Sequence, residues 1–230
     1  MRIAVFASGG GTNLQAILDH FAGPASDVAR VALVISDRAD AGALERARDA
    51  GVSTEVIPVT GRTAAEVARD SLAALERAGV GLIALAGYLR LVPAEVVRAY
   101  RDRILNIHPS LLPAFGGKGM YGLRIHRAVI EAGCRVSGLT VHIVDEAYDR
   151  GPILVQWPVP VLEGDTPEAL GARVLRVEHR IYPLVLEAAA RAAGGGEPVR
   201  PFRLPDDVAY SLVAGEAPPV AVLREALGLE

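Results

Sequence analysis

Residues 2–18 read RIAVFASGGGTNLQAIL, and this stretch indicates the fold class. The apolar run at 2–7 shows no alternation with polar residues, as expected of a strand that is buried on both faces. It ends in the glycines of SGGGTN, after which apolar residues recur at helical spacing. A strand, a glycine loop and a helix in this order predict the first unit of a doubly wound α/β fold.

The same order of elements continues along the first half of the chain. Further apolar runs, each predicted to be a strand, lie at 30–36, 54–59, 79–87 and 103–107. Helical patterns separate them, including one at 63–78 and one that opens with proline at 93. We therefore expect a mostly parallel sheet, covered by helices on both faces, with ligands at the carboxyl ends of its strands.

The second half has a different pattern. Two longer strands are expected at 138–145 and 152–161, joined through EAYDRG, which predicts an antiparallel or mixed edge. A long helix follows at 167–193, and Pro183 is expected to bend or break it. We interpret 1–193 as a catalytic domain with halves at 1–100 and 101–193, and 194–230 as a surface extension that could serve a subunit contact.

Composition narrows the class of protein. Hydrophobic residues make up 51% of the 230 residues, enough for a sizeable core, and the net charge of −3 argues against a nucleic-acid or anionic-membrane surface. A single cysteine, Cys134, excludes an internal disulfide and a multi-cysteine metal site, and no histidine spacing is typical of a metal site. No apolar run approaches the about 20 residues of a membrane span, and the amino terminus does not resemble a signal peptide. We expect a soluble, cytoplasmic protein without a metal.

The glycine loop at 8–13 is a candidate anion site. Backbone N–H groups at the start of a helix favour a negative charge. The loop lacks the third glycine of a dinucleotide fingerprint, because position 14 is leucine, and it lacks the lysine of a P-loop. A small phosphate is therefore the better hypothesis, and a tight turn with Thr12 as helix cap is the alternative.

The stretch LNIHPSLLP at 105–113 places Asn106 and His108 at the end of a predicted strand. An acidic turn with Asp145, Glu146 and Asp149 is expected at the same edge of the sheet. A carboxylate raises the pKa of a nearby imidazole, and an asparagine can donate to a developing oxyanion. A set of Asn, His and Asp that does not itself include a serine or cysteine suggests transfer to an external nucleophile.

Two other features allow more than one interpretation. The segment ALAGYLRLVP at 84–93 could hydrogen-bond a flat heterocycle through its backbone, or it could be an ordinary connection. Among the other histidines, His20 is expected at the surface and His142 in the core, and His179 could reach the site or lie on a helix face.

Taken together, these motifs resemble the phosphoribosylglycinamide formyltransferases of purine biosynthesis. The resemblance covers about residues 1–190 and includes SGGGTNLQAIL, LAGYLRLV, LNIHPSLLPAF, SGLTVHIVDEAYDRGPIL and RVEHRIYPLV. It implies transfer of a formyl group from 10-formyltetrahydrofolate to the amine of glycinamide ribonucleotide. Asn106 and a protonated His108 would stabilise the tetrahedral intermediate, and Asp149 would support the charged imidazole.

The resemblance also implies binding roles for other residues. The substrate phosphate would be held by Gly11, Thr12 and Asn13. The folate would contact Leu89, Arg90, Leu91, Val92, Asn106 and Asp145, with Arg62 as a further candidate. Glu178 would contact the ribose. The partners implied are small molecules, acting on a monomer or homodimer.

The chain departs from the family pattern in one loop. After LLPAF it carries GGKGMYGLRIH, several residues longer than the common link, which should alter the folate-tail region. Three alternatives stay open. Methionyl-tRNA formyltransferases usually carry an additional carboxy-terminal domain and formyltetrahydrofolate deformylases an amino-terminal one, and neither is expected in these 230 residues. A non-catalytic folate or nucleotide module is disfavoured by the joint presence of Asn106, His108 and Asp149.

Overall fold

The structure is a computed structural model that describes residues 1–197, 199, 201 and 220–229. One seven-stranded sheet forms its centre, in the order β3-β2-β1-β4-β5-β6-β7. The strands are β1 (Arg2–Phe6), β2 (Arg30–Ser36), β3 (Ser53–Val56), β4 (Leu82–Leu85), β5 (Ile104–His108), β6 (Val136–Ile143) and β7 (Ile153–Pro160). The helices are α1 (Thr12–Ala22), α2 (Gly42–Asp49), α3 (Ala64–Arg77), α4 (Ala94–Ala99), α5 (Leu123–Glu131), α6 (Pro167–Gly194) and α7 (Val220–Ala226).

The sheet is mixed in the way that the sequence predicts. The first five strands pair in parallel, and β6 and β7 continue the sheet in antiparallel pairing. This confirms a doubly wound, mostly parallel sheet with an antiparallel edge. β3 ends at Val56 and not at position 59, because Pro58 has no N–H with which to continue the ladder.

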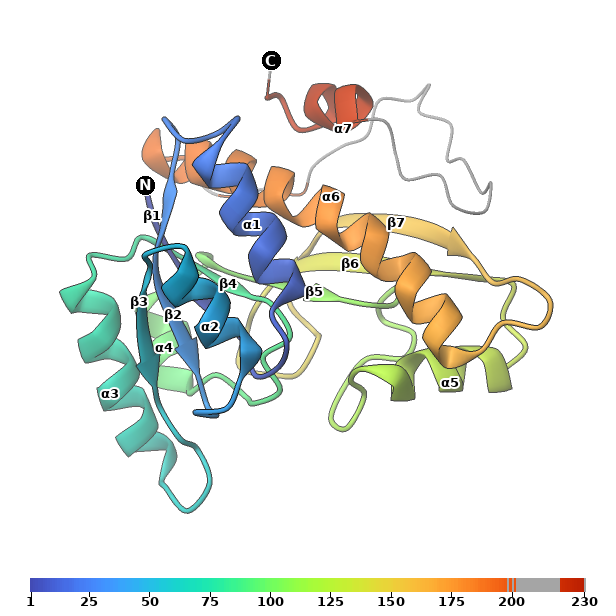
Figure 1. Cartoon of the computed structure of the whole chain (residues 1–230), viewed down its shortest axis with the longest axis horizontal. Helices are drawn as coiled ribbons and strands as arrows, with labels where there is room; N and C mark the ends of the chain where they lie inside the picture. The colour runs from blue at the N-terminus through green and yellow to red at the C-terminus, as the bar shows by residue number, and fades with distance from the viewer. Residues whose placement is uncertain (198, 200, 202–219, 230) are drawn as a thin grey trace.

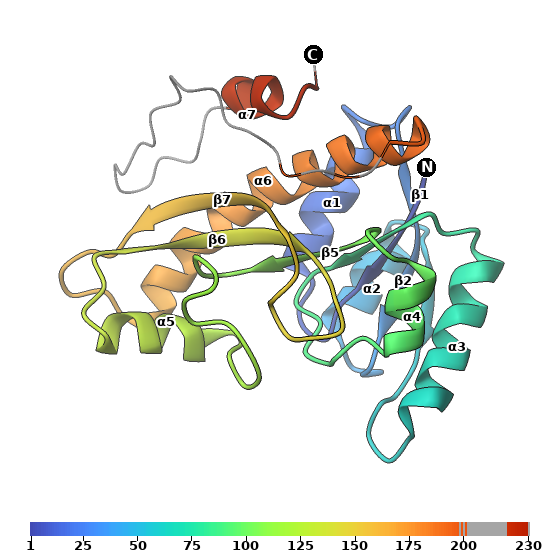
Figure 2. The same cartoon turned by 180° about the vertical axis from the view of Figure 1, so that it is seen from behind.

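Helices cover both faces of the sheet. One apolar core joins the sheet to α1, α2, α5 and α6, and a second core lies under α3 and α4. Figure 1 shows α1 crossing α6 on the first face, and Figure 2 shows α3 and α4 from behind. Because helices cover both faces of the sheet, a ligand site is expected at the loops that follow the strands.

The strand order reverses between β1 and β4, since β1 pairs with β2 on one side and β4 on the other. The ends of these two strands mark the switch point of the sheet, which is the usual ligand position in this class of fold. The loops that follow β1 and β4 are joined there, because the Ser8 N–H donates to the Gly87 carbonyl at 3.0 Å. The glycine loop therefore lies beside the 88–92 segment.

The long helix α6 runs without interruption through Pro183, so the prediction of a break is wrong. Proline removes one hydrogen bond from a helix, but residues on both sides of it are anchored in the core. Tyr182 is fully buried, and its hydroxyl lies 3.1 Å from the Leu85 carbonyl and 2.9 Å from the Leu105 carbonyl. Tertiary packing therefore holds the helix against the ends of β4 and β5.

The described part of the extension contains α7, which packs on α6. Leu223, Leu227 and Leu229 are buried, and Arg224 Nη1 lies 3.4 Å from Glu187 Oε2 of α6. Much of the predicted 194–230 extension, including 202–219, lies outside the described residues. Within the described residues, no helix combines the length and apolarity needed to cross a membrane.

Candidate active site

Strand β5 and its antiparallel neighbour β6 form the centre of the candidate site. Asn106 and His108 are two positions apart on β5, so their side chains leave the same face of the sheet. Across the pair, Asn106 lies opposite His142 of β6. The turn between β6 and β7 then returns Asp149 to these side chains, which confirms the expected convergence of Asn106, His108 and Asp149 in space.

His108 is oriented by a backbone carbonyl. Its Nε2 lies 3.0 Å from the Phe115 oxygen, and because a carbonyl only accepts, Nε2 carries the hydrogen. The other nitrogen, Nδ1, faces Asp149 Oδ1 at 3.7 Å. Burial lowers the pKa of His108, and Asp149 and the Phe115 carbonyl oppose this effect only in part. The imidazole without substrate therefore favours its neutral form, with the Nδ1 lone pair on the Asp149 side.

Asp149 is held in place by the loop that follows LLPAF. The Gly117 N–H donates to Asp149 Oδ2 at 2.8 Å. Asp149 has φ +53°, an uncommon conformation for a residue with a side chain and one often found at functional sites. Burial raises the pKa of Asp149, but His142, the Gly117 amide and His108 together outweigh it, so the pKa lies below its ordinary value. The carboxyl is thus ionised at neutral pH.

The residue before this amide is tightly packed. A Cβ on Gly116 would lie 2.5 Å from Leu112 Cδ2 and 3.3 Å from Asp149 Cβ. The segment 115–117 therefore fits closely against Asp149, while its Phe115 carbonyl binds His108. One short stretch of backbone orients both ionisable members of the candidate trio.

His142 is the member of the site that the sequence interpretation missed. It is buried, as expected, but its ring does more than fill the core. Nδ1 lies 2.9 Å from the Ile143 carbonyl, so it carries the hydrogen, and Nε2 accepts from Asn106 Nδ2 at 3.0 Å. His142 Nε2 is also 3.7 Å from Asp149 Oδ1. The ring thus fixes the orientation of the Asn106 amide and leaves its second N–H available.

The glycine loop has the geometry expected of an anion site. Gly11 is the residue before α1 and has φ +75°, and a Cβ there would lie 2.7 Å from Ala43 Cα. Thr12 is the first helical residue and makes no cap hydrogen bond, so the alternative of a Thr12 cap is wrong. Arg46 of α2 supports the loop, since its Nε donates to the Gly10 carbonyl at 2.8 Å.

The same loop is tied to the predicted ribose residue. Asn13 Nδ2 donates to Glu178 Oε2 at 2.6 Å, which joins the start of α1 to α6. Glu178 is buried, and burial raises its pKa to about 7, with the Asn13 hydrogen bond opposing the rise. The Oδ1 atom of Asn13 is buried and has no partner among the described residues. These two side chains are therefore poised for a polar ligand.

The 89–92 segment lies beside the glycine loop and is held by two contacts. The Leu89 N–H donates to Ser8 Oγ at 3.0 Å, and Arg90 Nε donates to Asp37 Oδ2 at 2.7 Å. The side chains of Leu89 and Leu91 are exposed, and Val92 is buried. Sequence reasoning found the segment but not its two supports, Ser8 and Asp37.

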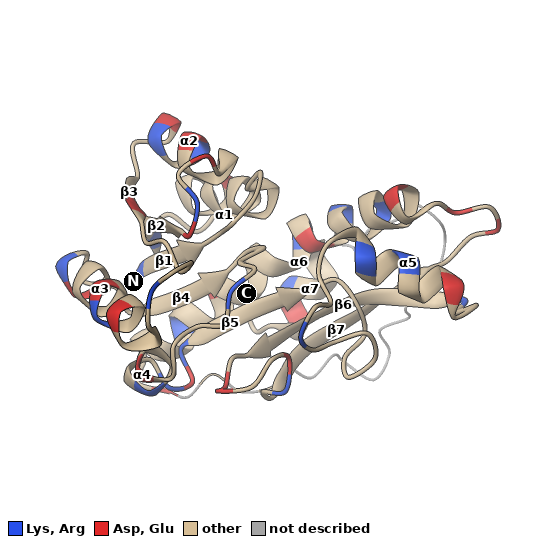
Figure 3. Ribbon diagram, turned by 90° about the horizontal axis from the view of Figure 1, so that it is seen from below, with Lys and Arg blue, Asp and Glu red and all other residues tan. Residues whose placement is uncertain are grey.

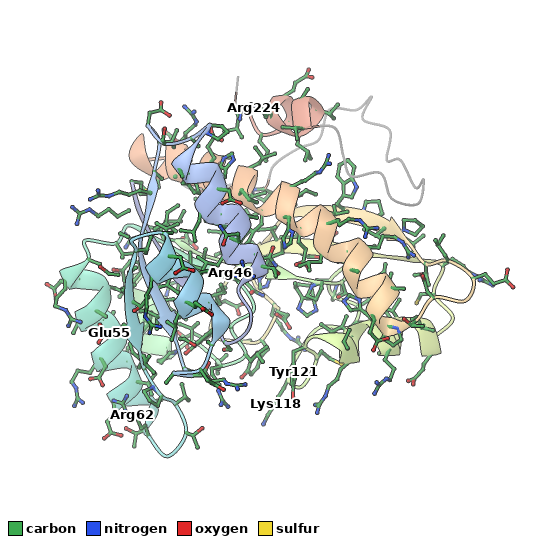
Figure 4. All side chains as sticks on the ribbon, in the orientation of Figure 1. Arg46, Glu55, Arg62, Lys118, Tyr121 and Arg224 are labelled. Atoms are coloured by element: carbon green, nitrogen blue, oxygen red, sulfur yellow. The ribbon has the colours of Figure 1, made fainter. Side chains whose placement is uncertain are left out.

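Two predicted folate residues have local partners in this structure. Arg62 binds Asp70 and the Pro58 and Glu66 carbonyls near the start of α3, where Figure 4 shows it. Asp145 accepts from the Ala147 N–H at 2.8 Å within its own turn. Their folate roles stay predictions. Among the described residues, no three His, Cys, Asp or Glu side chains gather as a metal site would require.

Comparison with known proteins defines the class. The formyl transferase family model matches residues 1–186, and the chain belongs to this family.

Several relatives within this family carry the same name, and the chain spans less than two thirds of the length of the first of them. The chain is 46% identical over 189 residues to the chloroplastic phosphoribosylglycinamide formyltransferase of Arabidopsis thaliana, a match that covers 81% of this chain and 64% of that protein. It is 39% identical over 188 residues to the phosphoribosylglycinamide formyltransferase of Escherichia coli (strain K12), covering 81% and 85%. The crystal structure of glycinamide ribonucleotide transformylase 1 from Symbiobacterium toebii is similar with a TM-score of 0.77 and 48% identity, covering 84% of this chain and 88% of that one.

Proposed function

We propose that this chain transfers a formyl group from 10-formyltetrahydrofolate to the amine of glycinamide ribonucleotide. The observation that carries the proposal is the convergence of Asn106, His108 and Asp149 at one end of β5. This trio lies on the same sheet as a phosphate-type loop at Gly11, Thr12 and Asn13. Family membership and the named relatives support the same activity.

The two substrates would bind to different elements at the carboxyl ends of the strands. The N–H groups at 11–13, at the positive end of α1, suit the phosphate of the ribonucleotide. Glu178, beside Asn13, would accept from ribose hydroxyls. The folate would lie against residues 89–92 and the 145–149 turn. The backbone amides of Arg90, Leu91 and Val92 have no protein partner among the described residues and are free to hydrogen-bond a heterocycle.

In the first step the glycinamide nitrogen attacks the formyl carbon, and the carbonyl electron pair moves to oxygen. The free N–H of Asn106 is placed to donate to that oxyanion, because His142 holds the other N–H. Charge that develops in a partly buried site is stabilised more strongly by such a donor than it would be in water.

In the second step a proton moves from the attacking nitrogen to the leaving nitrogen, N10. Neutral His108 can accept it at Nδ1, because Nε2–H is occupied by the Phe115 carbonyl. The imidazolium that forms lies beside ionised Asp149, which stabilises its charge. The C–N10 bond then breaks as His108 returns the proton to N10, directly or through a water. His108 is thus protonated during the reaction and neutral before it.

We further propose that the protein works in the cytoplasm on small-molecule substrates, as a monomer or homodimer, and without a metal. The net charge of −3 supports the absence of a nucleic-acid partner.

A formyl-transfer assay with two acceptors tests the proposal. With 10-formyltetrahydrofolate as donor, glycinamide ribonucleotide should be formylated and initiator methionyl-tRNA should not. Formylation of the tRNA alone would reassign the chain to the methionyl-tRNA enzymes. Release of formate without any acceptor would reassign it to the deformylases, and folate binding without turnover would indicate a non-catalytic module.

A further inference from the structure

A second cavity lies on the outer face of α1, bounded by α6 and by α7 of the extension. It encloses about 830 Å³, which is within the size range of small-molecule sites. One wall is the exposed stripe of α1 from Thr12 to Asp19, and the facing wall is the turn of α6 from His179 to Leu184. Val220 and Arg224 of α7 close one end. This groove is separate from Asn106, His108 and Asp149, none of which lines it.

Basic side chains predominate in the groove, although the chain has a net charge of −3. Arg46, Arg180 and Arg224 line it together with His20 and His179, and Asp19 is the one acidic residue of the lining. Figure 4 shows Arg46 beside α1 and Arg224 on α7. Elsewhere the signs are mixed, as on α3 in Figure 3. A concave surface with an excess of positive charge raises the local concentration of anions.

Two of these groups have no partner within the part of the chain that the structure describes. No hydrogen bond or ion pair engages the Arg180 guanidinium, and the buried Nε2 atom of His179 is unsatisfied. The other basic side chains are engaged internally, since Arg224 and His20 both bind the buried Glu187 and Arg46 binds the Gly10 carbonyl. Arg180, which is exposed, is therefore the charged group available to a ligand.

Part of the lining is apolar. Ala16 of α1, Pro183 and Leu184 of α6 and Val220 of α7 provide carbon surface between the charged groups. A bare inorganic anion would use only the cations, whereas a molecule with an apolar body would also bury this surface.

We propose that the groove is a second binding site, for an organic anion that joins one phosphate, sulfonate or carboxylate group to an apolar or aromatic body. The anionic group would pair with Arg180, whose planar fork suits a bidentate contact. The apolar body would lie on Ala16, Pro183 and Leu184, under α7. This assigns a role to the extension, which supplies one wall of the site.

The groove is also linked to the substrate side of the molecule. Thr12 belongs both to the groove and to the glycine loop, and Arg46 joins the groove to that loop through the Gly10 carbonyl. A ligand that recruits Arg46 would change the support of the loop, so occupancy is expected to alter the KM for the phosphorylated substrate.

The test uses 8-anilinonaphthalene-1-sulfonate, an aromatic sulfonate that fluoresces when bound, titrated into the full chain, with octyl phosphate as competitor. We expect one bound probe per chain, displaced by octyl phosphate and not by octanol. Arg180→Glu should weaken binding about tenfold or more through loss of the charged contact. Ala16→Phe, which fills the groove without changing charge, should do the same.

The matched control is Arg176→Glu, which makes the same charge change on an exposed position of α6 outside the groove. It should bind the probe as the unmodified chain does. Equal binding by Arg180→Glu and Arg176→Glu would overturn the proposal, as would no binding at millimolar probe. Thermal melts of each variant identify a folding defect. Because Arg180 is exposed and pairs with none of the described residues, its variant stays informative if Ala16→Phe does not fold.

Discussion

Replacement of His142 by phenylalanine is the substitution that most directly probes how the site is oriented. The phenyl ring keeps the bulk of this buried residue but removes the acceptor for Asn106 Nδ2. A neutral hydrogen bond contributes about 0.5–1.5 kcal/mol. If that free energy is expressed in the transition state, kcat should fall roughly 2- to 10-fold. Because the ring is not expected to touch substrate, both KM values should stay within about twofold.

A double-mutant cycle with Asn106→Ala separates orientation from general damage to the fold. Asn106→Ala removes the oxyanion donor and should cost about 100-fold or more in kcat. In that background His142→Phe should have almost no further effect, because nothing remains to orient. His142→Gln keeps an acceptor and should lose less activity than His142→Phe. Additive losses in the double variant would show that His142 acts by another route, and the reasoning would fail.

Three other changes test separate parts of the site. The pKa of Glu178 is raised to about 7 in the folded chain. Between pH 4.5 and 7 the folded state therefore binds more protons than the unfolded state, and the free energy of unfolding falls as pH rises through this window. Glu178→Gln should remove this pH dependence, whose size is at most about 3 kcal/mol. Denaturant titrations at pH 5 and 8 measure it. Gly116→Ala should press on Leu112 and Asp149 and lower kcat roughly 10- to 100-fold. The acid limb of the pH–rate profile should move to higher pH, because Asp149 loses the Gly117 amide that lowers its pKa. An unchanged profile would argue against this. Arg62→Gln should raise the KM for 10-formyltetrahydrofolate if Arg62 exchanges its present carboxylate partner for the ligand, and an unchanged KM would remove it from the site.

The sequence predicts the sheet and the position of the trio because both depend on local signals. Uninterrupted apolar runs mark the parallel strands, and the carboxyl ends of such strands must meet at one edge. Asn106 and His108 could therefore be placed together from the motif alone, and Asp149 from the turn between two longer strands.

What the sequence does not predict are the contacts that cross between elements. The role of His142 depends on its register opposite Asn106, and a one-residue slip would turn it to the other face. The amide of Gly117 and the carbonyl of Phe115 are backbone groups, which leave no side-chain signal. The continuity of α6 through Pro183 is set by burial of its neighbours, which outweighs the local preference of proline to interrupt a helix.

The central claim is that His108 carries the transferred proton in formyl transfer to glycinamide ribonucleotide. It is tested most directly by comparing steady-state formyl transfer in the unmodified chain and in His108→Ala, with KM for both substrates measured in parallel. The account predicts that kcat falls at least about 100-fold while both substrates still bind. Near-normal turnover by His108→Ala would contradict it.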